Sequence, residues 1–163
     1  MQKESLEEQI VGELYSRGLT ITTAESCTGG LLSGRLINAA GASDVLNEGY
    51  ITYSNEAKER ILGVSHRTLE SYGAVSRQTA EEMASGAAHA AKADIALTTT
   101  GIAGPGGGTA AKPVGLVYIG CYIKGEVTSV ECHFSGSRSE VRLSSVETAL
   151  HVLLDRLKGA ETL

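Results

Sequence analysis

The sequence has few cysteines and very few prolines. Its three cysteines, Cys27, Cys121 and Cys132, form no Cys-x-x-Cys pair, which excludes a disulfide framework and favours the reducing cytoplasm. Only 2 of the 163 residues are proline, whereas 20 are glycine. Glycine without proline indicates tight turns and close backbone approaches. We therefore expect one globular domain over residues 1–163.

Three further absences narrow the function. No apolar run approaches the ~20 residues of a membrane helix, and the acidic residues 1–10 do not resemble a signal peptide. The net charge of −5 argues against nucleic acid as a partner, because phosphate backbones need a basic face. The four histidines have no metal-ligand spacing, so we expect no metal and no histidine catalysis. We expect a cytoplasmic protein that acts on a small molecule.

Hydrophobic periodicity predicts alternating helices and strands. The predicted helices are residues 6–17, 31–37, 56–62, 77–91 and 139–157, and the predicted strands are residues 19–24, 45–53, 94–100, 114–123 and 126–134. Ser5 and Glu8 fit a capping box before the first helix, and Gly18 ends it. This order predicts an α/β fold, a three-layer α/β/α sandwich with a mixed β-sheet.

The last two strands are predicted to form a hairpin through the turn Lys124-Gly125. In that register Cys121 faces Thr128 and Cys132 faces Val117. The two cysteines are then not partners.

The first segment that could carry chemistry is Glu25-Ser26-Cys27, in a turn between a strand and a helix. A nucleophile at Ser26 would be held at the edge of the sheet, beside helix-start N–H groups that can stabilise an oxyanion. An ordinary N-cap role for Ser26 is the alternative. Cys27 is a rival nucleophile or a packing residue.

A second segment, residues 53–58, places Tyr53 at a strand end and Lys58 on the next helix. A neutral lysine can act as general base for a serine, provided that desolvation lowers its pKa from about 10.4. The alternative is a solvated lysine flanked by Glu56 and Glu59.

A glycine-rich loop, residues 101–108, follows a strand at the edge where open α/β sheets bind ligands. Its N–H groups could converge on an anion. It is no Walker A motif, because Gly107-Gly108 stands where Lys-Ser/Thr is required, and no dinucleotide fingerprint, because a strand follows it. A ligand loop and a plain surface loop both fit. Similarly, Arg138 and Arg142 could clamp a phosphate or form a solvated face.

Taken together and in order, these segments closely resemble the CinA C-terminal-domain family, also called the nicotinamide-nucleotide amidase (PncC) family. The resemblance covers nearly the whole chain. The matching stretches are AESCTGG at 24–30, YSNxxK at 53–58, TGIAGP at 100–105 with GG at 107–108, KPVGLV at 112–117 and FxGxRxxxR at 134–142.

The resemblance implies a three-layer α/β/α fold and hydrolysis of the carboxamide of nicotinamide mononucleotide, giving nicotinate mononucleotide and ammonia without a cofactor. It implies a serine–lysine mechanism with Ser26 as nucleophile, Lys58 as base and Tyr53 as a third catalytic residue, through which the Ser26 proton could reach Lys58. The substrate-binding residues that follow from it and from the glycine-rich loop are Thr28, Gly29, Gly30, Thr100, Gly101, Gly104, Gly106, Gly107 and Arg142.

The sequence departs from the family in two places. Ser137 stands where relatives often have Asp, which weakens the case for Arg138. Many relatives carry a larger N-terminal pyrophosphatase domain that this sequence does not show, so we expect no pyrophosphatase activity. An amidase for another phosphorylated metabolite and a noncatalytic nucleotide-binding module are the competing functions. The apolar strands and final helix lead us to expect a homo-oligomer.

Overall fold

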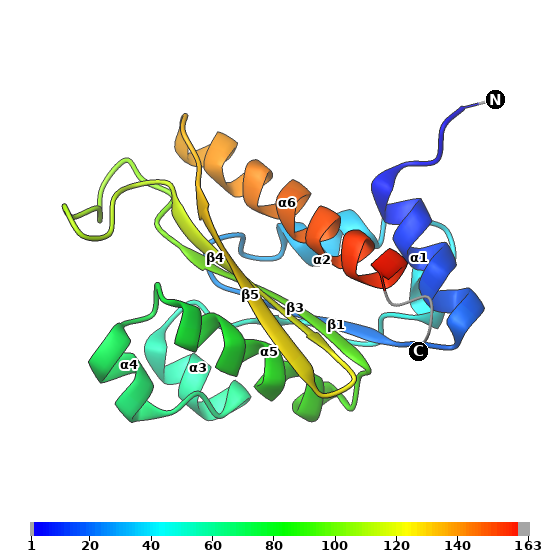
Figure 1. Cartoon of the computed structure of the whole chain (residues 1–163), viewed down its shortest axis with the longest axis horizontal. Coiled ribbons are helices and arrows are strands. Elements are labelled where there is room, and N and C mark those ends of the chain that lie inside the picture. Colours follow the sequence, from blue (N-terminus) through cyan, green and yellow to red (C-terminus); the bar gives the residue numbers. More distant parts are fainter. Residues whose placement is uncertain (1, 160–163) are drawn as a thin grey trace.

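The computed structural model describes residues 2–159, which form a sheet covered by helices on both faces. The helices are α1 (Leu6–Arg17), α2 (Leu31–Leu36), α3 (Asn55–Leu62), α4 (His66–Tyr72), α5 (Arg77–Ala91) and α6 (Arg138–Gly159). The strands are β1 (Ile21–Glu25), β2 (Tyr50–Ile51), β3 (Ile95–Gly101), β4 (Leu116–Ile123) and β5 (Glu126–His133). Helices α1, α2 and α6 cover one face of the sheet and α3, α4 and α5 the other (Figure 1). The predicted three-layer sandwich is confirmed.

The five strands form one mixed sheet in the order β2-β1-β3-β4-β5. Strand β1 is parallel to β2 and β3, whereas β3, β4 and β5 are antiparallel to one another in turn. The predicted hairpin register is also confirmed, since Cys121 pairs with Thr128 and Cys132 with Val117. The three cysteines are free and buried.

The helix ends follow the predicted capping. The Ser5 amide donates to Glu8 Oε2 at 2.7 Å and the Glu8 amide to Ser5 Oγ at 3.3 Å, which completes the capping box of α1. Gly18 ends this helix with a φ of 65°, in the left-handed region. The Ser54 and Ser76 side chains cap the N-termini of α3 and α5, where they accept hydrogen bonds from the amides of Ala57 and Thr79.

Two predictions of local structure were wrong or incomplete. The strand expected at residues 45–53 is only Tyr50–Ile51, because this edge strand pairs with β1 at two positions and the chain before it packs as irregular structure. Val45 is 2% exposed in that irregular segment. It is apolar because it is buried there, and in the sequence an apolar residue at this position resembles part of a strand. Helix α4 was not predicted, because Leu69 is its one buried residue and gives no apolar stripe.

Close backbone packing holds α5 between the sheet and α3. A Cβ atom on Gly86 of α5 would lie 1.8 Å from the Leu62 carbonyl oxygen at the end of α3. A Cβ atom on Gly120 of β4 would lie 2.4 Å from the Ala80 carbonyl oxygen of α5. Both positions therefore require glycine, and the first fixes the place of α3.

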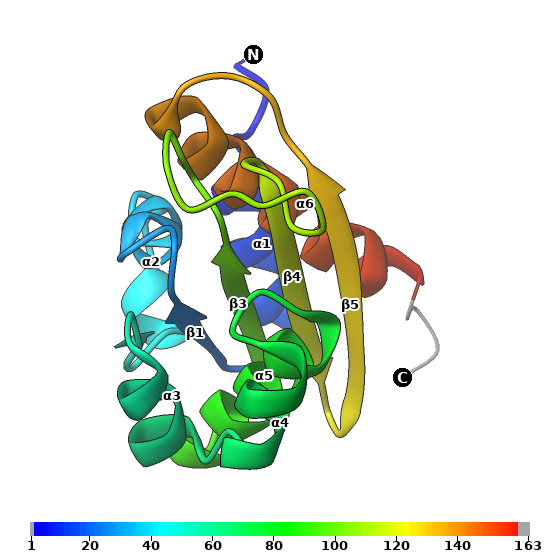
Figure 2. The ribbon, with the colours of Figure 1, turned by 90° about the vertical axis from the view of Figure 1, so that its left-hand side faces the viewer.

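The loops that follow β1, β2 and β3 gather at one end of the molecule, which faces the viewer in Figure 2. The glycine-rich loop lies at this end, and α1 begins at the opposite end (Figure 1). No helix between residues 2 and 159 is both long and apolar enough to cross a membrane.

Candidate active site

Ser26 lies directly after β1, at the start of the turn to α2. Its amide donates to the Thr99 carbonyl at 2.9 Å and so extends the β1–β3 ladder by one residue. The residue is 9% exposed. Ser26 is therefore held by the sheet rather than by a mobile loop.

The buried Glu25 carboxylate organises the turn around Ser26. It accepts hydrogen bonds from Thr28 Oγ1 at 2.6 Å and from the amides of Leu32 and Ser33 at 2.7 and 3.1 Å. These amides belong to the first turn of α2, where a carboxylate satisfies free N–H groups. The sequence analysis did not assign Glu25 a role, although an acidic residue at the end of a β-branched strand was a signal that could have found it.

Lys58 reaches Ser26 from α3 and is 1% exposed. Its Nζ donates to Ser26 Oγ at 3.0 Å, to the Thr52 carbonyl at 2.7 Å and to the Tyr53 carbonyl at 3.3 Å. Lys58 thus has three oxygen partners, and two of them are carbonyls that fix the amine beside the serine.

The surroundings of Lys58 make its neutral form more accessible than that of a solvated lysine. Within the described part of the chain, no carboxylate forms an ion pair with it. Burial lowers the pKa of Lys58 to about 8. The alternative of a solvated helix lysine is wrong, because Nζ points into the protein, and Glu59 instead bonds His66.

Burial makes Cys27 less reactive, because it disfavours the charged thiolate. It is 6% exposed, and burial raises the pKa of its thiol to about 11. The thiolate is the nucleophilic form of cysteine, so this environment disfavours Cys27 as the attacking group.

A cavity of about 210 Å³ opens above Ser26 and Lys58. Its lining comes from the turns after β1 and β2, from α3, from the end of β3 and the turn after it, from the loop before α5 and from the start of α6. The lining residues are Ser26, Cys27, Tyr53, Lys58, Ala74, Val75, Thr100, Gly101, Ala103 and Arg138. The structure thus brings together five of the predicted site residues, Ser26, Tyr53, Lys58, Thr100 and Gly101.

Tyr53 stands at the rim of this cavity and is 64% exposed. Its hydroxyl accepts a hydrogen bond from Arg138 Nη2 at 3.2 Å. Because Lys58 contacts Ser26 directly, a proton needs no relay through the Tyr53 hydroxyl. Thr100 lines the wall and donates through Oγ1 to the Ala74 carbonyl at 2.8 Å.

Several other predicted substrate-binding residues lie outside the lining. Thr28 is fully buried and bonds Glu25, so its hydroxyl supports the turn. Gly29 packs beneath Arg142, and the exposed Gly106 and Gly107 lie farther out in the loop. The Gly104 carbonyl oxygen accepts a hydrogen bond at 2.8 Å from Nη1 of Arg138, which lines the cavity.

The two arginines lie in different surroundings. Arg142 donates to the carbonyls of Cys27 and Thr28 at 3.0 and 3.2 Å and does not line the cavity. Arg138 does line it. Ser137, which had weakened the case for Arg138, forms a capping box with Glu140 at the start of α6. That cap fixes the helix turn from which Arg138 projects.

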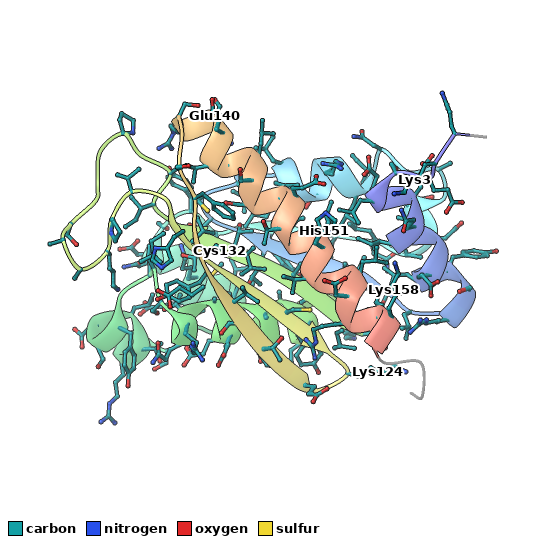
Figure 3. The ribbon with its side chains drawn as sticks, turned by 45° about the horizontal axis from the view of Figure 1, so that its top comes forward. Lys3, Lys124, Cys132, Glu140, His151 and Lys158 are labelled. Carbon is teal, nitrogen blue, oxygen red and sulfur yellow. The ribbon has the colours of Figure 1, made fainter. Side chains whose placement is uncertain are left out.

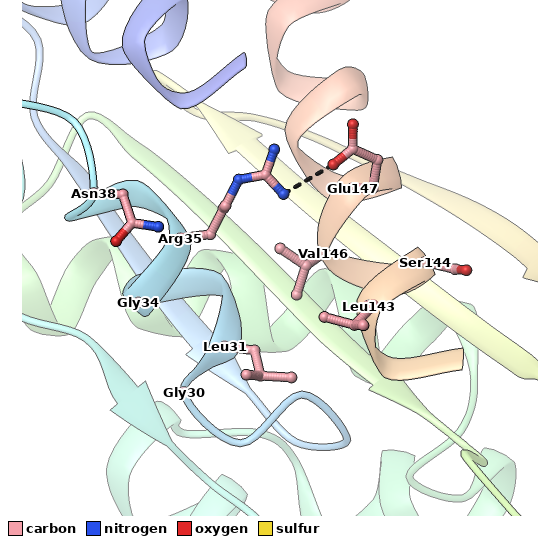
Figure 4. Close-up of a pocket in the computed structure, with 9 residues that line it drawn as sticks. All are labelled: Gly30, Leu31, Gly34, Arg35, Asn38, Leu143, Ser144, Val146 and Glu147. Carbon is pink, nitrogen blue, oxygen red and sulfur yellow. Dashed lines mark hydrogen bonds and ion pairs between the residues drawn. The ribbon is translucent and has the colours of Figure 1, made fainter. Parts of the chain in front are cut away.

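Gly30 belongs to a different and larger cavity, of about 640 Å³, between α2 and α6. Figure 4 shows its walls, where Leu31 and Leu143 approach from the two helices. Arg35 donates to Glu147 at 2.9 Å across it. No serine–lysine pair lines this cavity.

The histidines lie away from the Ser26 cavity; His151, for example, lies on α6 (Figure 3). Among residues 2–159, no group of three or more His, Cys, Asp or Glu side chains could hold a metal ion.

Fold and site together define an α/β domain with a buried serine–lysine pair at the carboxyl edge of its sheet. The family model of the CinA C-terminal domain matches residues 3–157, and the chain belongs to this family.

Known relatives and structures agree with this assignment. A protein of Clostridium beijerinckii named as competence-damage inducible is 53% identical over 149 residues, which cover 91% of this chain and 36% of that protein. The chain therefore spans about a third of the length of such relatives. The crystal structure of the competence/damage inducible protein CihA from Agrobacterium tumefaciens is 45% identical, with a TM-score of 0.91, and covers 97% of this chain and 99% of that one. A CinA superfamily protein from Escherichia coli is 38% identical, with a TM-score of 0.89 over 94% and 93% of the two chains.

Proposed function

We propose that this chain is an amidohydrolase that converts nicotinamide mononucleotide to nicotinate mononucleotide and ammonia. The observation that carries the chemistry is the 3.0 Å contact between Lys58 Nζ and Ser26 Oγ, made by a buried amine with a lowered pKa. A serine is a weak nucleophile unless a neighbouring base removes its proton. The sequence resemblance supplies the substrate.

In the first half-reaction, neutral Lys58 accepts the Ser26 proton and the serine oxygen attacks the carboxamide carbon. The Thr52 and Tyr53 carbonyls hold the amine, so its lone pair is directed at the serine. The tetrahedral intermediate develops negative charge on oxygen, which amide N–H groups can stabilise.

The structure narrows which amides are free for that oxyanion. The Ser26 amide bonds Thr99, the Gly29 amide bonds the Ser26 carbonyl, and the Leu32 and Ser33 amides bond Glu25. In the described turn from Ser26 to Ser33, the amides of Cys27, Thr28 and Gly30 donate no hydrogen bond, and those of Cys27 and Thr28 are nearest to Ser26 in sequence. These two N–H groups follow the nucleophile directly and are our candidates for the oxyanion donors.

Collapse of the intermediate breaks the carbon–nitrogen bond. Protonated Lys58 gives its proton to the departing nitrogen, which leaves as ammonia, and an acyl ester remains on Ser26. Water then enters, loses a proton to Lys58 and attacks the ester, which releases the acid and restores both residues.

The test is ammonia release from the purified chain with nicotinamide mononucleotide, in metal-free buffer. We expect turnover by the wild type and a loss of about 10³-fold or more in Ser26→Ala. Cys27→Ser serves as the matched control beside it and should retain turnover. Activity in Ser26→Ala together with its loss in Cys27→Ser would transfer the nucleophile to Cys27.

A silent but folded wild type would contradict the amidase and favour a nucleotide-binding module. Equal turnover of unphosphorylated nicotinamide would point instead to an amidase with another substrate. Circular dichroism of each variant establishes that the fold is retained.

A further inference from the structure

We propose that β5 is the interface through which two copies of this chain form a symmetric dimer, with their sheets joined edge to edge. The proposal does not depend on the reaction at Ser26. Strand β5 is the last in the order of the sheet and lies at the edge that faces the viewer in Figure 1. Within the described part of the chain, its only neighbouring strand is β4.

The two edges of the sheet differ in how they are protected. An edge strand presents unpaired N–H and C=O groups, which proteins usually protect by shortness, proline, lysine or a bulge. At the other edge, β2 is only 2 residues long. Strand β5 is 8 residues long, its sequence EVTSVECH contains no proline or lysine, and it pairs with β4 residue by residue without a bulge. A long, regular edge of this kind is suited to pairing with another strand.

The hydrogen bonds to the chain beside β5 determine which of its backbone groups face outward. The Phe134 amide donates to the Gly115 carbonyl at 2.9 Å, so the backbone of Phe134 points towards the β4 side. This orientation alternates along an antiparallel strand. The residues whose backbone points away from β4 are therefore Val127, Ser129, Glu131 and His133. Among residues 2–159, no other backbone group bonds their N–H and C=O groups.

Two-fold symmetry then restricts the register of a pair of β5 strands. The outward-facing residues must lie opposite one another to form a ladder, so a residue whose backbone points to β4 lies on the axis. In the register centred on the strand, this residue is Val130, opposite its own copy. Ser129 then lies opposite Glu131 of the second copy, and Val127 opposite His133.

In this register β5 is complementary to itself, as a two-fold interface requires. Val130 is 37% exposed, and the axis brings two copies of it together in a non-hydrogen-bonded pair, where side chains are closest. Each Glu131 lies opposite a serine and not opposite another carboxylate. No like charges therefore face each other across the seam, and the apolar contact lies at its centre.

The joined sheet leaves both Ser26 cavities open. Strand β5 runs in the same direction as β3, because each is antiparallel to β4, so both strands end on the side of the cavity. A two-fold axis reverses this direction in the second copy. The two cavities then open at opposite ends of the joined sheet, and a monomeric variant should keep the catalytic rate of the dimer.

Light scattering after size-exclusion chromatography tests the dimer and its register. We expect the wild type to have twice the mass of one chain. Val130→Lys and Val130→Glu should each be monomeric, because like charges then meet on the axis. An equimolar mixture of the two variants should recover the dimer, because opposite charges meet there. A monomeric wild type, or variants that stay dimeric when alone, would overturn the proposal.

Leu143→Lys is the matched control for these substitutions. Leu143 is 59% exposed on the cavity between α2 and α6, and this variant should remain a dimer. Dissociation by Leu143→Lys and not by Val130→Lys would place the interface on α2 and α6 instead. Circular dichroism establishes that each variant is folded.

A disulfide across the axis gives a second readout that needs no charged substitution. The Cα atoms of a non-hydrogen-bonded pair lie about 4.5 Å apart, a distance that suits a disulfide. Val130→Cys should therefore form a covalent dimer under mild oxidation, whereas Val127→Cys, opposite His133, should not. The native cysteines are buried and do not compete. Equal cross-linking of the two variants, or none in Val130→Cys, would contradict the register.

Discussion

Lys58 shows how strongly one side chain depends on its surroundings. In sequence it stands between acidic residues on a short helix, a context typical of a solvated lysine. In the fold its amine is 1% exposed and bonds three oxygens, none of them from a carboxylate. Burial without a compensating anion lowers the pKa of Lys58 to about 8, which leaves a useful neutral fraction near neutral pH.

The first prediction concerns the pH dependence of ammonia release. Lys58 must be neutral to accept the Ser26 proton, so kcat/KM should rise with pH and level off above a midpoint of about 8. Lys58→Arg should lose about 10³-fold or more, because arginine stays protonated at every accessible pH. A rate that is flat from pH 6 to 10 would exclude Lys58 as the base.

The second prediction concerns Glu25, which is fully buried and accepts four hydrogen bonds in total from Thr28 and from the first turn of α2. Glu25→Gln keeps the size but replaces one acceptor oxygen with a donor, which leaves amides unpaired. We expect the free energy of unfolding to fall by about 1–3 kcal/mol, measured by urea denaturation, with a reduced kcat because the Ser26 turn loosens. An unchanged urea midpoint would show that the carboxylate has no stabilising role.

At the scale of elements, the sequence analysis predicted the helices and strands that have a strong hydrophobic periodicity. The stripe on α6 is buried as expected, at Val146, Ala149, Leu150, Leu153, Leu154 and Leu157. The strand β2 was predicted with wrong bounds and the helix α4 was not predicted, because both are short and bury few residues of their own. Their positions are set by tertiary packing, which a periodic pattern does not encode.

The third prediction concerns the contact between α5 and α3. Gly86→Ala would place a methyl group 1.8 Å from the Leu62 carbonyl oxygen, so α3 must move. We expect a loss of about 1–3 kcal/mol in the free energy of unfolding, and a lower kcat because α3 carries Lys58.

Gly12→Ala in α1 is the matched control for this substitution. No atom lies within 4 Å of its added Cβ, so the change should stabilise the protein by up to about 1 kcal/mol. Equal thermal stability of the two variants would argue against close packing at Gly86.

At the scale of the whole molecule, the sequence analysis predicted the layered fold, and it proposed Ser26 and Lys58, which the structure brings together at one candidate site. The direct contact of these two residues and the placement of Arg138 were beyond it, because both depend on how separate loops meet in space. The single domain, the cytoplasmic location and the homo-oligomer stay predictions.

The fourth prediction links Lys58 to the stability of the whole fold. Between pH 8 and about 10.4, the unfolded chain binds the Lys58 proton and the folded chain does not, so stability rises with pH in this window. Relative to Lys58→Met, the wild type should gain about 3 kcal/mol in the free energy of unfolding between pH 7 and 10.5. Guanidinium titrations of both proteins at the two pH values measure this difference. A constant difference would mean that the lysine has an ordinary pKa in the fold.

The loops that follow β1 and β3 lie towards one end of the molecule, and α1 lies towards the other (Figure 1). A polypeptide joined ahead of α1 would therefore emerge on the side remote from Ser26. The same geometry makes the α1 end a suitable point for attaching an affinity tag, a fluorophore or a solid support while catalysis is assayed.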